Sequence, residues 1–210
     1  MDERDVRSAI TPLRMVFWGG LLCVLDFNLS IASGGSGFQL DLLNDIPGAW
    51  LIAVGVSRLA RAPVGGGYAG EMAFVKAMAI LAVPKAFLDH FILTLPAPAQ
   101  IILLLFTIVT LCAVVVFCTA MSRFCAEAGL ESAERSWKLT RLLFILITLL
   151  PIGAMHLISI AALTTGESFR YDLGPAALLV VPIFLIPIIH LFVSTSRMKD
   201  AAGAMRVGAY

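Results

Sequence analysis

Six polar residues interrupt the apolar stretches of this sequence and are its first candidates for chemistry: Asp26, Asn28, Lys85, Asp89, His90 and His156. Ionisable groups inside a membrane cost about 2.5 to 3.5 kcal/mol each, so a layer of them indicates a functional site. Asp26 and Asp89 could serve as exchangeable carboxylates of a cation or proton pathway, with Lys85 paired to either. The layer could also bind a small polar solute. A purely structural role stays open, because Lys85 and Asp89 are spaced as an i,i+4 helical pair.

The surrounding sequence predicts that membrane helices position these residues. Hydrophobic residues make up 60% of the 210-residue chain and the mean hydropathy is +0.94, values that exclude an ordinary soluble domain. We expect an all-α fold, with residues 1–210 forming a single transmembrane helical bundle. Its six predicted helices span approximately residues 15–32, 40–61, 72–95, 99–121, 141–163 and 174–194.

The basic residues predict the orientation of this bundle. Twelve of the fifteen Lys and Arg residues fall on one side of it: Arg4, Arg7, Arg14, Arg58, Arg61, Arg123, Arg135, Lys138, Arg141, Arg197, Lys199 and Arg206. Arg170 falls on the other side, and Lys76 and Lys85 lie within the third helix. Because cytosolic loops are enriched in Lys and Arg, both termini are predicted to be cytosolic, with the six candidate polar residues in the outer half of the membrane.

The second predicted helix allows two interpretations. Its uncharged core, residues 46–57, covers only ~18 Å of a membrane core of ~30 Å, so the segment could be re-entrant. A re-entrant segment would invert everything after it, leaving four basic residues inside and nine outside. The charge distribution therefore favours a full crossing, with Arg58 and Arg61 reaching back to the cytosolic surface.

Two more features concern the organisation of the chain. Residues 15–25 could pass for the apolar part of a signal peptide, but the acidic start favours a first helix that is retained. The pattern Phe-x-x-Asp-Leu occurs at residues 38–42 and again at 169–173, each time before a predicted crossing. Whether helices 1–2 and 5–6 are an internal repeat stays open.

The start of the second helix carries a local signature. Pro47 suits a first helical turn, and Asp45 can cap that turn and complement its positive end. Gly48, Ala49 and Ala53 are small enough for close helix packing. We expect the opposing face on the third helix, at Ala73 and Ala77 or at Ala82 and Ala86.

The segment from Asp41 to Gly55, about a tenth of the chain, resembles a hairpin motif of small polytopic bacterial membrane proteins of unassigned function. In that motif an acidic apolar run leads to Pro-Asp, a Gly and a Leu-Ile-Ala-x-Gly helix. Here Asn44 stands in place of the proline, and Pro47-Gly48 shifts the turn. The resemblance implies a multi-pass protein of the bacterial inner membrane and no particular activity.

Other motifs point away from catalysis and cofactors. The four cysteines form neither a C-x-x-C pair nor a Cys/His cluster and are expected to be free thiols. His90 and His156 share a depth, but lone histidines usually pack through hydrogen bonds, so we expect no haem or metal there. Residues 34–37 match the short G-x-S-G pattern of rhomboid proteases, although a flexible turn fits an external loop better. The net charge of +1 argues against a nucleic-acid partner.

The sequence therefore predicts a non-enzymatic integral membrane protein whose partner is the lipid bilayer. It is expected to be a structural or accessory component of a membrane assembly, with protein partners or further copies of itself in the membrane. The alternative is a small transporter or an ion or proton pathway that uses the outer polar layer. An intramembrane enzyme is the third, least favoured class.

Overall fold

The computed structural model describes residues 3–24, 28–33, 36–41, 45–89, 95–165 and 177–207. In this part of the chain the regular elements are helices and one two-stranded β-hairpin, joined by short loops. The elements are α1 (Glu3–Val24), β1 (Asn28–Ser33), β2 (Ser36–Asp41), α2 (Asp45–Leu59), α3 (Tyr68–Asp89), α4 (Ala97–Glu127), α5 (Glu131–Leu143), the π-helical segment η2 (Phe144–Leu149), α6 (Leu150–Thr165) and α7 (Ala177–Val207).

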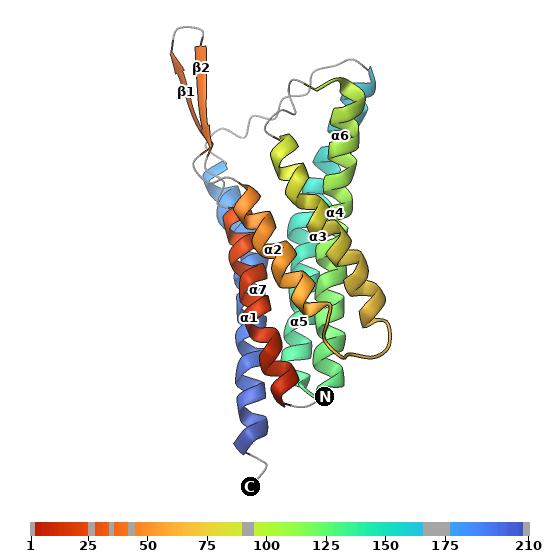
Figure 1. Cartoon of the computed structure of the whole chain (residues 1–210). Coiled ribbons are helices and arrows are strands. Elements are labelled where there is room, and N and C mark those ends of the chain that lie inside the picture. Colours follow the sequence, from red (N-terminus) through yellow and green to blue (C-terminus); the bar gives the residue numbers. More distant parts are fainter. Residues whose placement is uncertain are drawn as a thin grey trace.

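The helices form one elongated bundle in which successive passes alternate in direction (Figure 1). The start of α1, the end of α7 and the connections α2–α3 and α4–α5 lie at one end, which we call the terminal end. The β-hairpin projects from the opposite end, the hairpin end. Helices α5 and α6 are joined through η2 into one pass, so the described residues make six helical passes, as the sequence predicts.

Two of these passes are long and apolar enough to cross a membrane: α4, and the continuous helix Glu131–Thr165. The π-helical segment within the second has a local cause. Pro151 has no backbone N–H, so the carbonyl of Ile147 loses its α-helical partner just where η2 ends. A wider π turn is one way for a helix to accommodate such a break.

Several predicted boundaries need correction. The first predicted helix, 15–32, was placed too late: α1 starts at Glu3, and residues 28–33 are a strand, so the prediction of Asn28 on a membrane helix was wrong. In this strand polar and apolar residues alternate from Asn28 to Ile31, and the register pairs Ile31 with Phe38 and Asn28 with Asp41. The second predicted helix, 40–61, is also shorter, since residues 36–41 form β2 and α2 has only 15 residues.

The last predicted helix, 174–194, continues well beyond its predicted end. Helix α7 runs on to Val207, and its extension is held by packing, because Met198 is fully buried and Ala202 is 1% exposed. Helix α4 likewise extends past residue 121 to Glu127. Both extensions lie at the terminal end and lengthen the bundle there.

The best-packed part of the core lies toward the terminal end. The large side chains that are fully buried include Leu13 in the middle of α1, Tyr68 of α3, Phe124 of α4 and Trp137 of α5, and the last three are close to the terminal ends of their helical passes. The ring of Trp137 meets Phe117 edge-on at a centroid distance of 5.9 Å. This dense half holds the six passes together.

Candidate functional site

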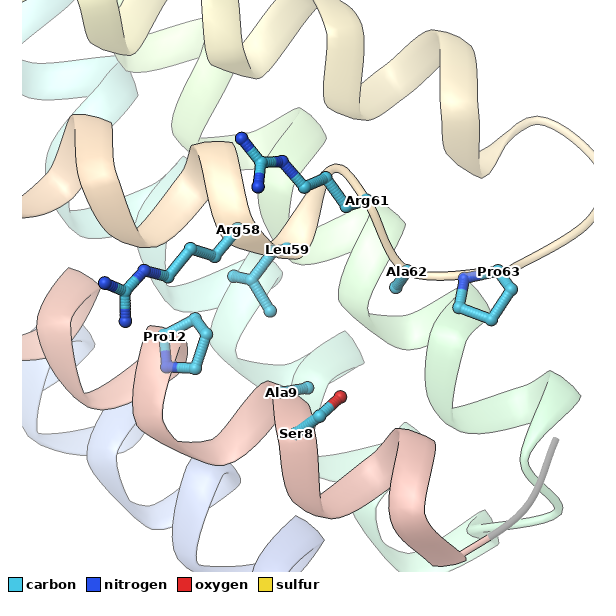
Figure 2. A pocket seen from close by; sticks show the side chains of 8 residues that line it. All are labelled: Ser8, Ala9, Pro12, Arg58, Leu59, Arg61, Ala62 and Pro63. Carbon is cyan, nitrogen blue, oxygen red and sulfur yellow. The ribbon is translucent and has the colours of Figure 1, made fainter.

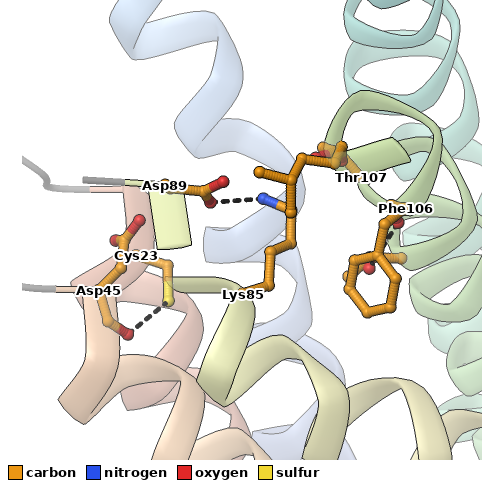
Figure 3. Close-up of polar contacts among 8 residues, drawn as sticks. Cys23, Asp45, Lys85, Asp89, Phe106 and Thr107 are labelled. Atoms are coloured by element: carbon orange, nitrogen blue, oxygen red, sulfur yellow. Dashed lines mark hydrogen bonds and ion pairs between the residues drawn. The ribbon is translucent and has the colours of Figure 1, made fainter. Parts of the chain in front are cut away.

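Of the six candidate polar residues, the structure brings together Lys85 and Asp89. The Lys85 ammonium lies 2.5 Å from the Asp89 carboxylate one turn along α3, with side chains 16% and 33% exposed (Figure 3). His156 lies on α6, on a different helix from this pair. Asp26 and His90 lie outside the described residues, and Asn28 belongs to β1. Lys85 therefore has a partner on its own helix, as the i,i+4 spacing predicts.

The predicted start of α2 is found where the sequence placed it. Asp45 is the first residue of the helix, and the Cys23 thiol of α1 donates a weak hydrogen bond, 3.9 Å long, to the Asp45 carbonyl (Figure 3). Pro47 lies exposed in the first turn, where its missing N–H costs nothing. Gly48, Ala49 and Ala53 follow on the buried side of α2.

Gly48 contacts α1, and not α3 as the sequence suggested. A Cβ on Gly48 would lie 2.6 Å from Cys23 Sγ and 2.8 Å from the Gly19 carbonyl oxygen. One on Gly55 would lie 2.7 Å from the Pro12 carbonyl oxygen. On α3, Ala73 and Ala77 are exposed. The small residues of α2 thus allow two backbones to touch, as in small-xxx-small packing.

A second polar cluster, which sequence reasoning missed, lies between α5 and α7. Its members are Ser136, Thr140, His190 and Ser194; the three hydroxyl residues are at most 1% exposed. Thr140 Oγ1 lies 3.0 Å from the Ser136 carbonyl oxygen, 2.8 Å from His190 Nδ1 and 2.7 Å from Ser194 Oγ. Ser136 Oγ and Ser194 Oγ are 2.8 Å apart. We call these four residues the hydroxyl cluster.

The direction of every bond in the hydroxyl cluster follows from counting hydrogens. Thr140 has one hydroxyl hydrogen, and a carbonyl oxygen can only accept, so Thr140 donates to the Ser136 carbonyl. Thr140 must then accept from His190 Nδ1–H and from the Ser194 hydroxyl, which leaves the Ser136 hydroxyl to donate to Ser194. Every donor is satisfied, and a neutral His190 ring keeps Nε2 as an acceptor. Such a network stabilises the α5–α7 contact, whereas its buried hydroxyls are poorly placed to attack a substrate.

The sequence does contain a signal for this cluster. Ser136 and Thr140, and likewise His190 and Ser194, are spaced by four residues, which puts each pair on one face of its helix. Only the packing of α5 against α7 makes the two faces meet. The sequence reading treated His190 as a lone histidine near the cytosolic end.

Two cavities border the end of α2. The smaller, of about 160 Å³, lies where α1, α2 and the following loop meet, and Ser8, Pro12, Arg58 and Arg61 are among its lining residues (Figure 2). The larger, of about 620 Å³, is a groove between α2 and α3. Arg58 and Arg61 line both cavities.

The loop after α2 is fixed to the end of α4. The Gly65 backbone N–H donates to both carboxylate oxygens of Glu127, at 2.9 and 3.1 Å, and Arg123 pairs with Glu71 at 3.0 Å. The Tyr68 hydroxyl donates to the Leu59 carbonyl at 2.9 Å, and burial raises the pKa of Tyr68 above its ordinary value. These contacts are structural.

The described residues contain no group of three His, Cys, Asp or Glu side chains that could hold a metal ion, and Cys23, Cys112, Cys118 and Cys125 are free thiols. No protein family, curated protein or solved structure matches the chain. The candidate sites are therefore defined by geometry alone: the Lys85–Asp89 pair, the buried hydroxyl cluster and two cavities that share two arginines.

Proposed function

We propose that this chain is a multi-pass protein of the bacterial inner membrane that serves as a non-catalytic, structural or accessory component of a membrane assembly. Its six helical passes would be six crossings, with both termini in the cytosol. Two passes with the length and apolarity of a membrane span support this proposal. The twelve basic residues that the sequence places on the terminal side support the orientation.

The observation that carries the accessory role is the closed packing of the terminal half of the bundle. Met121, Phe124 and Trp137 are fully buried there, and Phe117 is 3% exposed. A transport pathway needs a hydrated route through this level, whereas the polar groups described there, the hydroxyl cluster, hydrogen-bond to one another. Close packing of aromatic and sulfur-containing side chains suits a scaffold better than a channel.

Large apolar side chains cover the outer surface of the bundle and give it faces for contact within a membrane. Ile102 on α4 is 66% exposed, Leu157 on α6 is 58% exposed and Ile189 on α7 is 57% exposed. In a bilayer these faces contact either lipid or the helices of a partner protein. An accessory component would keep one of them covered by its partner.

Photocrosslinking in native membranes tests this role. A photoreactive amino acid is placed in turn at Ile102, Leu157 and Ile189. At one of these positions we expect a crosslinked adduct with one partner protein of a single mass, and the amount of adduct should rise and fall with the expression level of this chain. The matched control is Met121 on α4, which is fully buried and should give none. Lipid adducts alone at all three exposed positions would count against an accessory role.

The alternative function, a small transporter or proton pathway, is favoured by one observation: Lys85 and Asp89 form an ion pair within α3, with side chains 16% and 33% exposed. Flux of protons or K⁺ into proteoliposomes tests it, with the variant Lys85→Met/Asp89→Asn. The matched control is Glu131→Gln/Arg135→Gln, which removes an exposed i,i+4 pair with a nitrogen–oxygen distance of 3.2 Å. Flux lost in the first variant and kept in the second would establish transport in place of the accessory role.

A further inference from the structure

Arg58 and Arg61 both line the two cavities at the end of α2, and neither has an acidic partner among the described residues. Arg123 pairs with Glu71, Arg135 with Glu131 and Lys138 with Glu134. Both Arg58 and Arg61 are exposed, and no side chain in the described part of the chain forms an ion pair with either. Guanidinium groups without a counter-ion that line the same cavities can bind an anion.

The two arginines lie at the junction of a small polar-edged cavity and an apolar groove. On one side, the cavity of about 160 Å³ includes the Ser8 hydroxyl group (Figure 2). On the other, the groove of about 620 Å³ is walled by Trp50 and Val54 of α2 and by Ile80 and Val83 of α3. A ligand that fills both would be charged at one end and apolar along the rest.

The groove runs along the helices over the length of an acyl segment. Trp50 precedes Arg58 by eight residues, a rise of ~12 Å along α2. Trp50 is 61% exposed and Ile80 is 48% exposed, so the groove opens to the surroundings of the bundle. In a membrane those surroundings are lipid.

The length of α2 places Arg58 at a depth that favours lipid phosphate. The helix has 15 residues and so rises ~22 Å, less than the ~30 Å of a typical hydrocarbon core. A short crossing is accommodated by local thinning of the bilayer or by flanking residues that reach the interface. Arg58, in its last turn, would therefore meet headgroup phosphates directly.

We infer that Arg58 and Arg61 bind the phosphate of an anionic phospholipid, one of whose acyl chains lies in the groove between α2 and α3. Guanidinium groups bind phosphate oxygens in a bidentate manner, and basic pockets between membrane helices suit anionic headgroups. This inference rests on the membrane topology of the proposed function and not on the accessory role.

Native mass spectrometry of the full chain in detergent, titrated with phosphatidylglycerol or phosphatidylcholine, tests the headgroup. We expect one phosphatidylglycerol to bind in preference to phosphatidylcholine. Two basic residues near a membrane surface contribute about 1 kcal/mol each, so Arg58→Gln/Arg61→Gln should weaken binding roughly thirtyfold. The charge-matched control Arg135→Gln/Arg197→Gln, at exposed positions, should change it less than about twofold. Equal affinity for the two lipids, or equal losses in the two variants, would overturn the inference.

A second pair of variants separates a lipid from free phosphate. Ile80→Trp narrows the groove and should weaken phosphatidylglycerol binding while leaving any binding of inorganic phosphate unchanged. Ile102→Trp, at an exposed position of α4 outside the groove, is the control. If inorganic phosphate displaces the lipid and Ile80→Trp has no effect, the arginines bind a free anion and the lipid assignment is wrong. Thiol labelling of single cysteines introduced into the α2–α3 loop tests the topology independently.

Discussion

Two adjacent glycines of α1 give a matched test of the close contact between α1 and α2. A Cβ at position 19 would lie 2.5 Å from the Gly48 carbonyl oxygen and 2.7 Å from Ile52 Cγ1. A Cβ at position 20 would have nothing within 4 Å. Gly19→Ala and Gly20→Ala therefore make the same chemical change one residue apart, once inside the contact and once outside it.

The expected difference follows from the geometry. Ordinary contact begins at 3.4 Å, 0.9 Å beyond the 2.5 Å separation, and the obstructing atom belongs to the backbone, so α1 and α2 must move apart. Overpacking of this kind costs about 1 to 3 kcal/mol. The gain in helix propensity, up to ~1 kcal/mol, is common to both variants and cancels between them. We expect Gly19→Ala to be less stable than Gly20→Ala by about 2 kcal/mol.

Reversible unfolding in mixed micelles, with denaturing detergent as the titrant and tryptophan fluorescence as the signal, measures this difference. Gly55→Ala serves as an independent repeat, since its Cβ would lie 2.7 Å from the Pro12 carbonyl oxygen. If Gly19→Ala and Gly20→Ala unfold within ~0.5 kcal/mol of each other, the backbones of α1 and α2 do not touch as described and the reasoning fails.

Three further outcomes are expected. In the same unfolding titration Thr140→Val should cost about 1 to 3 kcal/mol, because the His190 Nδ1–H and the Ser194 hydroxyl lose their acceptor. Ser136→Ala leaves every remaining donor satisfied and should cost ~0.5 kcal/mol. A larger cost for Ser136→Ala than for Thr140→Val would contradict the bond directions. Glu127→Gln should speed amide exchange in the α2–α3 loop, measured by mass spectrometry, while Glu131→Gln should not. Tyr68→Phe should cost ~1 kcal/mol. Because burial raises the pKa of Tyr68 above 10, the wild type should lose stability as the pH rises above about 10, and a Tyr68→Phe variant with an unchanged alkaline slope would contradict this.

The sequence predicts those parts of the fold that depend on local pattern. Apolar stretches predict six helical passes, and Glu131, Arg135, Glu134 and Lys138 form the i,i+4 pairs that their spacing requires. The β-hairpin was missed because β1 follows directly on an apolar stretch, and the polar–apolar alternation that marks a strand holds only from Asn28 to Ile31. The extension of α7 was missed because Met198 and Ala202 owe their burial to other helices.

In the candidate sites too, contacts within one helix could be predicted from the sequence and contacts between helices could not. The Lys85–Asp89 pair lies within one helix, so spacing alone predicts it. The hydroxyl cluster joins residues more than fifty positions apart, and the partner of Gly48 is set by which helix packs against α2. Neither can be read from local spacing, because each depends on how whole helices are arranged.

Arg58 and Arg61 are proposed to serve two purposes: they help to orient the chain in the membrane, and they bind lipid. Orientation in a membrane depends on the number of basic residues on each side, whether or not they later pair with acids. Lipid binding depends on charges that remain unpaired in the folded bundle and adjoin an apolar surface. Arg123 and Lys138 serve only the first purpose, since Glu71 and Glu134 neutralise them. Neutralising Arg58 and Arg61 should therefore weaken lipid binding without inverting the chain, because the remaining basic residues still favour the same orientation.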